Sequence, residues 1–520
     1  MTDSTPDPSA RARTAAPSTA RGLPMTSRWD PQKLAREVEA LQELEGRPLA
    51  ARLRGYFKLT GPAWMQSAMT LGAGSAVASV VAGAFYGYNL LWVQPIAMLL
   101  GVAMMAALAN IVLTKGERAY SIFARELHPA IALLWALATI VATIIWHFPQ
   151  YALAGAAVWD IASTLGIRNP PGARAAELAV KFAGGFAILG VNTYMVWSYG
   201  SKPAGIKLYE GFLRWMIRIV ILAFLVVVIK SGIGKGFHIG AMLRGFAVPS
   251  IPEGATTTIL GAIGAAVGIN MTFLYPYSIL AKGWGKHHKG LARFDLLGSL
   301  LLPYVILTSL IIIAMASTIH QPPFGTNLPG NPPITGLKPI DAAQSLAGIL
   351  GQFGGRIIFD LGFFGMACGA ISAHMVVSGF TFCEMLGLEY TPARYRRFAL
   401  VPAIGLIGVA FPSPLWMPIV ASAIAFSMLP IAYISFFILN NKRRYLGDAV
   451  GRGPRRWLYN AVLFVAMAMS LVGAAMNIKE RVIAPIQRML APPAPAAIEE
   501  PAETEPGHGR GAMSGPESSE

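Results

Sequence analysis

The sequence predicts an all-α polytopic membrane protein with about eleven transmembrane helices. Residues 61–114 contain no Asp, Glu, Lys or Arg, and a run of this length is sufficient for two crossings of about 20 residues each. Similar uncharged runs cover 129–159, 255–281, 296–337, 398–441 and 457–478. Charged residues make up 13% of the chain and hydrophobic residues 54%, whereas about 25% of a soluble domain is charged. The composition therefore excludes an ordinary soluble domain.

The charged loops between these runs set the predicted topology. The expected helices cover 61–88, 89–114, 129–163, 179–198, 209–230, 256–281, 294–318, 355–385, 398–411, 415–440 and 456–478. Lys and Arg number 18 in the loops on one side (115–128, 199–212, 282–293, 388–397, 441–456) and 6 in those on the other (164–177, 230–255, 319–345, 412–414). Basic loops stay in the cytoplasm, so we expect a multi-pass inner-membrane protein with its N-terminus in the cytoplasm and its C-terminus outside. This asymmetry also accounts for the net charge of +16 without a nucleic-acid partner.

Four segments are expected along the chain. Residues 1–29, rich in Ser, Thr, Pro, Ala and Arg, predict a disordered cytoplasmic tail. Residues 30–58 predict an amphipathic, interfacial helical segment, because Asp30-Pro31 is typical of a helix start and apolar residues follow at helical spacing. Residues 59–480 form the transmembrane domain, with helices 1–5 and 6–10 as inverted repeats plus helix 11. Residues 481–520, rich in Pro, Ala and Glu, predict a disordered extracytoplasmic tail.

Two of the predicted helices are interrupted by glycine at corresponding positions of the two halves. The segments are Gly72-Ala73-Gly74-Ser75 in the first helix and Gly268-Ile269-Asn270-Met271 in the sixth. Each glycine costs a helix about 1 kcal/mol relative to alanine, and a break at membrane depth is tolerated only where the freed backbone is buried in protein or lines a wet cavity. Matched broken helices indicate an inverted-repeat transporter with its site near the bilayer midplane. The alternative is close glycine packing between helices.

Several motifs occur in the order and spacing of a known family. They are Gly61-Pro62, Ala82-Gly83-Ala84-Phe85-Tyr86-Gly87-Tyr88, Asp341-Ala342-Ala343 and Arg443-Arg444-Tyr445-Leu446-Gly447. Over residues 58–480 the chain thereby resembles the NRAMP divalent metal transporters. The resemblance implies a LeuT-type 5+5 inverted-repeat bundle and, usually, proton-linked uptake of Mn²⁺ or Fe²⁺.

The chain departs from that family at the functional residues. The family has Asp-Pro-Gly-Asn in helix 1 and Met-Pro-His-Asn in helix 6, so its metal-binding positions fall on Gly72, Ser75 and Gly268 here. Its acidic pair in helix 3, associated with proton movement, matches His147 and Gln150. The broken backbone is retained, whereas the metal-coordinating side chains are absent.

The candidate substrate-binding residues are the two interrupted segments themselves. They are Gly72, Ala73, Gly74, Ser75, Gly268, Ile269, Asn270 and Met271. Neither segment contains a carboxylate, which hard divalent cations prefer, so no metal ligand is assigned. A divalent metal remains the expected substrate, and Mg²⁺, which gives up water reluctantly, fits better than Mn²⁺ or Fe²⁺.

His147 and Gln150 are the candidates for a proton relay. An ionisable residue within the membrane is a functional candidate, and histidine exchanges a proton near neutral pH. The alternative is an uncharged histidine that is hydrogen-bonded across helices. For His374, in the eighth helix, the structural interpretation is favoured.

Two other functions remain open. The half-helix N-termini would also attract a small organic or anionic solute, and a decayed site would leave a non-transporting sensor or scaffold. Enzymatic activity and a cofactor are not expected, because there is no phosphate-binding glycine loop and no Gly-x-Ser-x-Gly elbow. The expected partners are a divalent metal ion or other small solute, protons and the lipid bilayer.

A charged series marks the cytoplasmic start of the fifth helix. Glu210, Arg214 and Arg218 are spaced four residues apart. This spacing predicts a local ladder of ion pairs that stabilises the helix end, with a gating role as the alternative.

Overall fold

The computed structural model describes residues 31–199, 203–236, 238–343, 351–411, 415–479 and 483. The predicted tail 1–29 lies outside these residues, as does the tail 481–520 apart from Ile483. Residues up to Asn477 form one compact unit.

The described part of the chain begins with two helices that pack on the segment 286–295. The predicted segment 30–58 contains α2 (Pro31–Glu45) and α3 (Leu49–Leu59). The helix α3 packs against α14 (Lys289–Asp295), where Tyr56 and Phe294 lie with ring centroids 5.6 Å apart. The segment therefore attaches to the start of the seventh membrane span.

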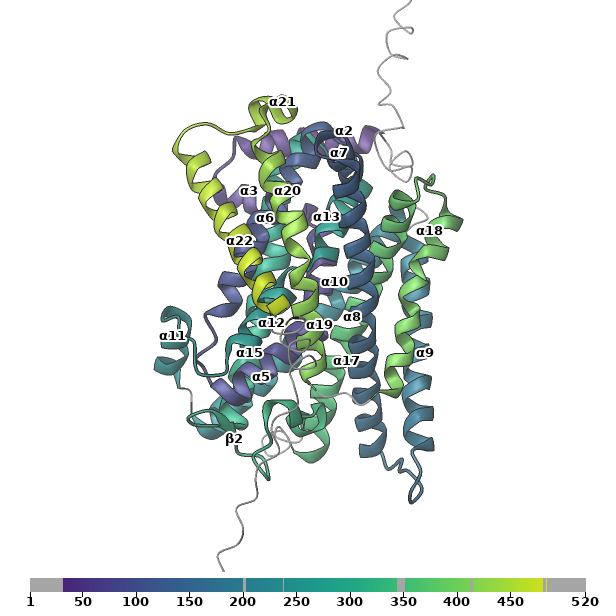
Figure 1. Ribbon diagram of the computed structural model, residues 1–520, viewed down its shortest axis with the longest axis vertical. Helices are drawn as coiled ribbons and strands as arrows, with labels where there is room; N and C mark the ends of the chain where they lie inside the picture. The colour runs from purple at the N-terminus through teal and green to yellow at the C-terminus, as the bar shows by residue number, and fades with distance from the viewer. Residues whose placement is uncertain are drawn as a thin grey trace, which may run out of the picture. The chain divides into compact units, whose positions relative to one another are not determined.

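The membrane-spanning helices follow the predicted order. They are α4 (Pro62–Thr70) with α5 (Ala73–Tyr86), α6 (Val93–Lys115), α8 (Pro129–Thr164), α9 (Ala175–Tyr199), α10 (Pro203–Lys235), α12 (Thr256–Ala266) with α13 (Ile269–Ala281), α15 (Leu302–Thr318), α17 (Gln352–Met385), α19 (Trp416–Ser427) with α20 (Leu429–Asn441), and α22 (Pro454–Ile478). Within the described residues nine spans are long and apolar enough to cross a membrane, and ten if the bent pair α4 and α5 is one span. All of these lie in a single helical bundle (Figure 1).

Both predicted helix breaks are present. The first span bends by 50° between α4 and α5, and Gly72 at the break has an extended backbone. The sixth span is interrupted at Val267 and Gly268, which are both extended. Each span thereby becomes two half-helices, whose ends at the junction have backbone groups without an intrahelical partner.

The prediction of an α-helix over 398–411, the ninth in order, is wrong. The chain forms α18 (Pro392–Ala399) and then a 3₁₀ helix, η5 (Val401–Ala410). Residues three apart share one face of a 3₁₀ helix, and here Gly405 and Gly408 face α8. A Cβ added at Gly405 would lie 2.3 Å from the His147 Cβ, and one added at Gly408 would lie 2.4 Å from the Phe148 carbonyl oxygen. Close backbone packing on α8 thus overrides the α-helical expectation.

The short helices and strands between the spans lie at the two ends of the bundle, on the sides that the charges of the loops predict. In Figure 1, α2, α7 (Ala119–Glu126), α18 and α21 (Arg443–Leu446) lie toward one end of the bundle, and α11 (Ile239–Ala247) and β2 (Gly325–Thr326) toward the other. The strand β2 pairs antiparallel with β1 (His320–Gln321). Loops that the sequence assigns to one face therefore lie at one end.

The helices α8 and α17 pack along much of their length and position the polar groups of the bundle. Near one end, Arg356 of α17 donates from Nε to Asp160 Oδ2 of α8 at 3.1 Å and forms a second bond to Oδ1. Asp360 lies beside this pair, 2% exposed, and its Oδ2 atom has no hydrogen-bond partner among the described residues. Further along the same interface are His147 and His374.

Candidate functional site: a cavity between two helix breaks

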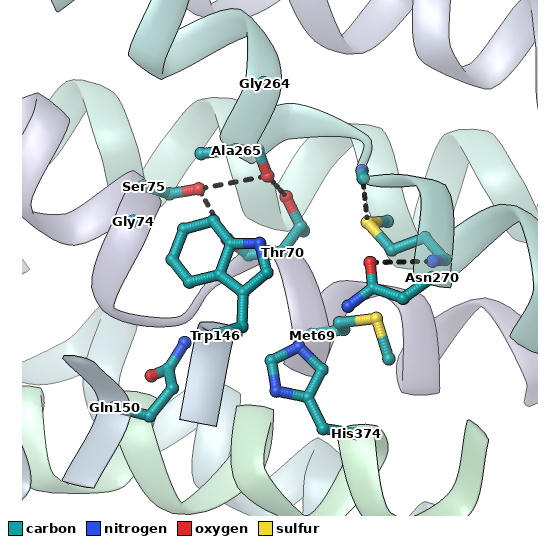
Figure 2. Close-up of a pocket in the computed structure, with 12 residues that line it drawn as sticks. Met69, Thr70, Gly74, Ser75, Trp146, Gln150, Gly264, Ala265, Asn270 and His374 are labelled. Atoms are coloured by element: carbon teal, nitrogen blue, oxygen red, sulfur yellow. Dashed lines mark hydrogen bonds between the residues drawn. The ribbon is translucent and has the colours of Figure 1, made fainter. Parts of the chain in front are cut away.

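A small cavity lies where the two broken spans meet α8 and α17 (Figure 2). Its volume is about 20 Å³, room for roughly one water molecule. The residues that line it are Met69, Thr70, Gly74, Ser75, Trp146, Gln150, Gly264, Ala265, Gly268, Asn270, Met271 and His374. None of these lining residues is acidic, and the described residues contain no cluster of three or more His, Cys, Asp or Glu that would hold a metal ion.

The carboxyl ends of α4 and α12 are closed by hydroxyl groups. The Thr70 hydroxyl lies 2.8 Å from the carbonyl oxygens of both Ala265 and Ala266, and donates to them as a shared bond. The Ser75 hydroxyl donates to the Thr70 carbonyl oxygen at 2.5 Å. Carbonyl groups that a helix end leaves free are therefore satisfied across the junction, and α4 is tied to α12.

The amino ends of α5 and α13 are held by amide side chains. Gln150 Oε1 of α8 accepts a hydrogen bond from the Ala73 N–H at 2.9 Å. Asn270 Oδ1 accepts from the Met271 N–H at 3.0 Å, so its Nδ2 atom points into the cavity, buried and without a partner among the described residues. The Gly268 N–H lies 3.4 Å from the Met271 sulfur and donates to it.

Two histidines from α8 and α17 lie together at the edge of the cavity. Their ring centroids are 5.1 Å apart, and both side chains are almost completely buried. His147 Nδ1 lies 2.9 Å from the Thr143 carbonyl oxygen, and must donate to it, which leaves Nε2 as the unprotonated nitrogen of the neutral ring. His147 Nε2 and His374 Nδ1 have no hydrogen-bond partner among the described residues. The pair thus holds free ring nitrogens close to the cavity.

Buried polar contacts tie the start of α4 to its neighbours at the end of the bundle where α2 and α3 lie. Asp295, fully buried, accepts hydrogen bonds from the backbone N–H groups of Gly61 (3.2 Å) and Ala63 (2.8 Å) at the start of α4. Lys282 Nζ, which follows α13, lies 3.0 Å from Glu210 Oε2 of α10 and donates to the Thr60 carbonyl oxygen. These contacts hold α4, whose residues are all buried, against the rest of the bundle.

This arrangement corrects the predicted ladder along the fifth helix. The salt-bridge partner of Glu210 is Lys282, whereas the Arg214 guanidinium lies over the Trp64 ring, 5.6 Å from its centroid, and Arg218 lies over Trp215. Tertiary packing brings Lys282 to Glu210, and this contact replaces the local pairing that the spacing predicts.

The opposite end is covered by the β1–β2 hairpin, which packs on α5. His320 Nδ1 lies 3.2 Å from the Ala84 carbonyl oxygen, and the rings of Tyr86 and Phe324 have centroids 5.9 Å apart. The cavity is therefore held between contacts at both ends of the bundle.

The structure brings together most of the candidate site residues. Gly74, Ser75, Gly268, Asn270, Met271 and Gln150 line the cavity. Gly72, Ala73 and Ile269 shape the breaks without lining it, and His147 lies behind His374.

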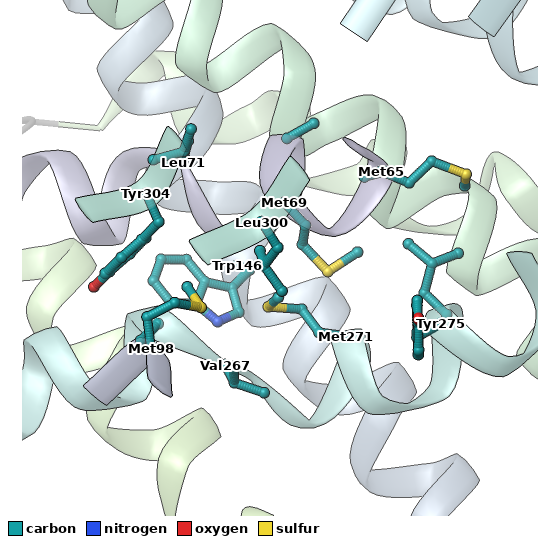
Figure 3. Packing of buried hydrophobic residues seen from close by; sticks show 14 of the residues in the cluster. Met65, Met69, Leu71, Met98, Trp146, Val267, Met271, Tyr275, Leu300 and Tyr304 are labelled. Atoms are coloured by element: carbon teal, nitrogen blue, oxygen red, sulfur yellow. The ribbon is translucent and has the colours of Figure 1, made fainter. Parts of the chain in front are cut away.

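Sequence reasoning missed Met69, Thr70, Trp146, Gly264 and Ala265 on the wall, and it treated His374 as structural. Met69 and Thr70 occupy the last turn of α4, immediately before the break at Gly72. Figure 3 shows Met69 and Met271 among the buried aromatic and aliphatic side chains around the breaks.

Comparison with known proteins agrees with this architecture. A manganese transporter from Eremococcus coleocola has a similar fold, with a TM-score of 0.60 and 14% identity over 84% of this chain and 89% of that chain. The nucleobase-cation-symport-1 family transporter Mhp1 has a TM-score of 0.51 and 14% identity over 81% and 92% of the two chains. The fold is therefore that of a multi-pass membrane protein of the LeuT type, a bundle with two inverted repeats.

The family follows from the sequence. Residues 63–476 match the model of the natural resistance-associated macrophage protein-like family, Nramp, and the chain belongs to that family. A similar curated relative is the divalent metal cation transporter MntH of Acidiphilium cryptum, which is 24% identical over 436 residues, 79% of this chain and 90% of the relative.

Proposed function

We propose that this protein is a secondary transporter that moves a divalent metal ion across the membrane by alternating access. The observation that carries the proposal is the cavity between two half-helix junctions. Membership of the Nramp family and the similarity to MntH support the substrate class. No enzymatic step is part of the proposal.

The size of the cavity limits how much hydration an ion can keep in this conformation. The cavity has room for roughly one water molecule, whereas a hydrated Mg²⁺ carries about six. A fully hydrated ion therefore requires the junction between the breaks to widen.

Uptake into proteoliposomes tests the proposal. We expect the protein to move Mn²⁺ or Mg²⁺, and we expect Gly74→Ala to lower the rate by about tenfold, a barrier increase of about 1.4 kcal/mol. The reason is that a Cβ at Gly74 would lie 2.2 Å from Trp146 Cη2 and force the indole into the cavity. Gly190→Ala in α9 is the control, because nothing lies within 4 Å of its added Cβ. Failure of every divalent metal to cross at millimolar concentration would contradict the proposal.

We also propose that transport is coupled to protons through His147, with Gln150 one turn further along α8. The support is the contact between His147 and His374, which places a ring nitrogen without a partner beside the cavity. A pH gradient imposed on wild-type proteoliposomes should change metal uptake, and His147→Ala should remove that change. His287→Ala, in an exposed loop position, is the control. Uptake that is equally insensitive to the gradient in all three proteins would remove His147 from the mechanism.

We further propose an inner-membrane location with the N-terminus in the cytoplasm and the C-terminus outside. The support is the distribution of basic residues, which are concentrated in the loops near α7, α18 and α21. In this orientation the contacts of Asp295 and Lys282 lie at the cytoplasmic end of the bundle and the β1–β2 hairpin lies at the outer end.

A further inference from the structure

The short helix α11, between the fifth and sixth spans, has an apolar side that faces away from the bundle. Its inner side contains the buried Gly245 and the partly buried Met242, which packs on the core. Beside this inner side, Ile239, Leu243 and Phe246 are 60%, 63% and 37% exposed. They are spaced four and three residues apart, so they form one stripe along the helix.

The remaining side of α11 is polar. Gly240 and Arg244, four residues apart, are both exposed and share this side. Consecutive residues of a helix are about 100° apart, so Arg244 lies on a different side from Leu243. Helices that lie in the surface of a bilayer have this division: apolar side chains enter the boundary between headgroups and acyl chains, and a basic residue lies nearer the water.

Close contacts fix α11 against the turn that follows the first span. The Trp92 N–H donates to the Gly245 carbonyl oxygen at 3.0 Å, and Trp92 Nε1 donates to the Ser250 carbonyl oxygen, also at 3.0 Å. A Cβ added at Gly245 would lie 2.2 Å from the Tyr88 carbonyl oxygen, so the two backbones touch. The helix is therefore held in one orientation, with its apolar stripe turned outward.

The exposed apolar surface continues from α11 onto the neighbouring spans. Ile233, near the end of α10, is 78% exposed, and Ile96, in the first turn of α6, is 39% exposed. Both helices are long and apolar enough to cross the membrane, so these side chains face lipid. Figure 1 shows α11 beside the bundle, level with α5 and α15. At this depth the material next to the stripe is lipid as well.

We propose that α11 lies in the surface of the bilayer, with Ile239, Leu243 and Phe246 among the lipid acyl chains and Arg244 at the level of the phosphates. The leaflet is the one on the side of the β1–β2 hairpin. The partner is the phospholipid bilayer itself, and the proposal is independent of the ion that is transported. Through Trp92 and Gly245, the bilayer then has a direct connection to the turn after α5, the outer half of the first broken span.

Spin labels on the full-length protein test this placement in liposomes of phosphatidylethanolamine and phosphatidylglycerol. Cys368 and Cys383 are first replaced by alanine, so that the nitroxide reacts only with an introduced cysteine. The label is placed at Leu243→Cys, on the apolar stripe. Gly240→Cys, on the polar side of the same helix, is the matched control, because nothing lies within 4 Å of its added Cβ.

The measurement is the rate at which each label collides with oxygen, which concentrates among acyl chains, and with a water-soluble nickel complex present on both sides of the membrane. We expect the oxygen-to-nickel ratio at position 243 to exceed the ratio at position 240 several-fold. Ile239→Cys provides a second position on the stripe and should give the same result as Leu243→Cys. It replaces Leu243→Cys in the comparison if that variant does not fold.

Two results would overturn the proposal. Collisions mainly with the nickel complex at the stripe positions would place the stripe in water. Poor access for both reagents would show that protein, such as a second copy of this chain, covers the stripe. The readout requires no transport, so a label immersed in lipid on a protein that moves no metal would refute the proposed transport and leave the placement of α11 standing.

Discussion

Replacement of Arg356 by methionine is expected to destabilise the protein by about 3–5 kcal/mol, the usual cost of removing one partner from a buried ion pair. Arg356 bridges α17 to Asp160 of α8, where the carboxylate is only 4% exposed, and Asp360 is close by. Without the guanidinium, two carboxyl groups remain at a buried interface with no cation to compensate them. The measurement is the Tm of purified protein in detergent for wild type and variant.

The control and the rescue both follow from the structure. Arg452 forms a pair with Asp448 four residues away, and its side chain is 83% exposed, so Arg452→Met should change the Tm little. Asp160→Asn in the Arg356→Met background should recover part of the loss, because the uncompensated charge is the cause. Equal Tm values for the two arginine variants would show that the buried bridge does not stabilise the bundle.

Replacement of Asp295 by alanine is expected to cost about 2–6 kcal/mol and to loosen the inner end of the first span. Asp295 accepts two backbone N–H groups at the start of α4, and each buried donor left without a partner costs about 1–3 kcal/mol. Asp295→Asn retains one acceptor atom and should lose less. The Tm measures the stability. Labelling of a cysteine introduced at Ala63, in the background without Cys368 and Cys383, measures the opening of α4.

Asp341→Ala provides the comparison for this substitution. Asp341 also accepts a backbone N–H, from Lys338 at 2.9 Å, but that bond lies at an exposed position where water replaces it. We expect a small change in Tm and none in labelling at position 63. If Asp295→Ala and Asp341→Ala change the Tm and the labelling at position 63 equally, the hydrogen bonds from Asp295 do not hold the start of α4 in place.

The order of the spans and the two breaks could be predicted because both are local properties of the sequence. Uncharged runs indicate the spans, and glycine at Gly72 and Gly268 lowers the helix propensity at the junctions. The wall of the cavity was harder to predict. A half-helix of nine residues such as α4 contains too few turns for periodicity to show which face turns inward, so Met69 and Thr70 carried no separate signal.

Contacts between distant residues account for the remaining differences. His374 acquires its place beside His147 only through the packing of α17 on α8, across more than two hundred residues. In the same way, Glu210 pairs with Lys282 and not with the arginines of its own helix. Comparison with the family motif identified the positions at the breaks, whereas Met69 and Thr70 of the preceding turn and His374 of α17 join the wall only through packing.

The ninth span has a mechanical consequence. A 3₁₀ helix rises about 2.0 Å per residue and an α-helix about 1.5 Å, so the ten residues of η5 would shorten by about 5 Å on conversion to α-helical geometry. Because Gly405 and Gly408 rest on the backbone of His147 and Phe148, such a contraction would slide α8 relative to its neighbour beside the cavity. Because His147 and Gln150 both lie on α8, a change in the pitch of η5 would act directly on the turn that contains the two relay candidates.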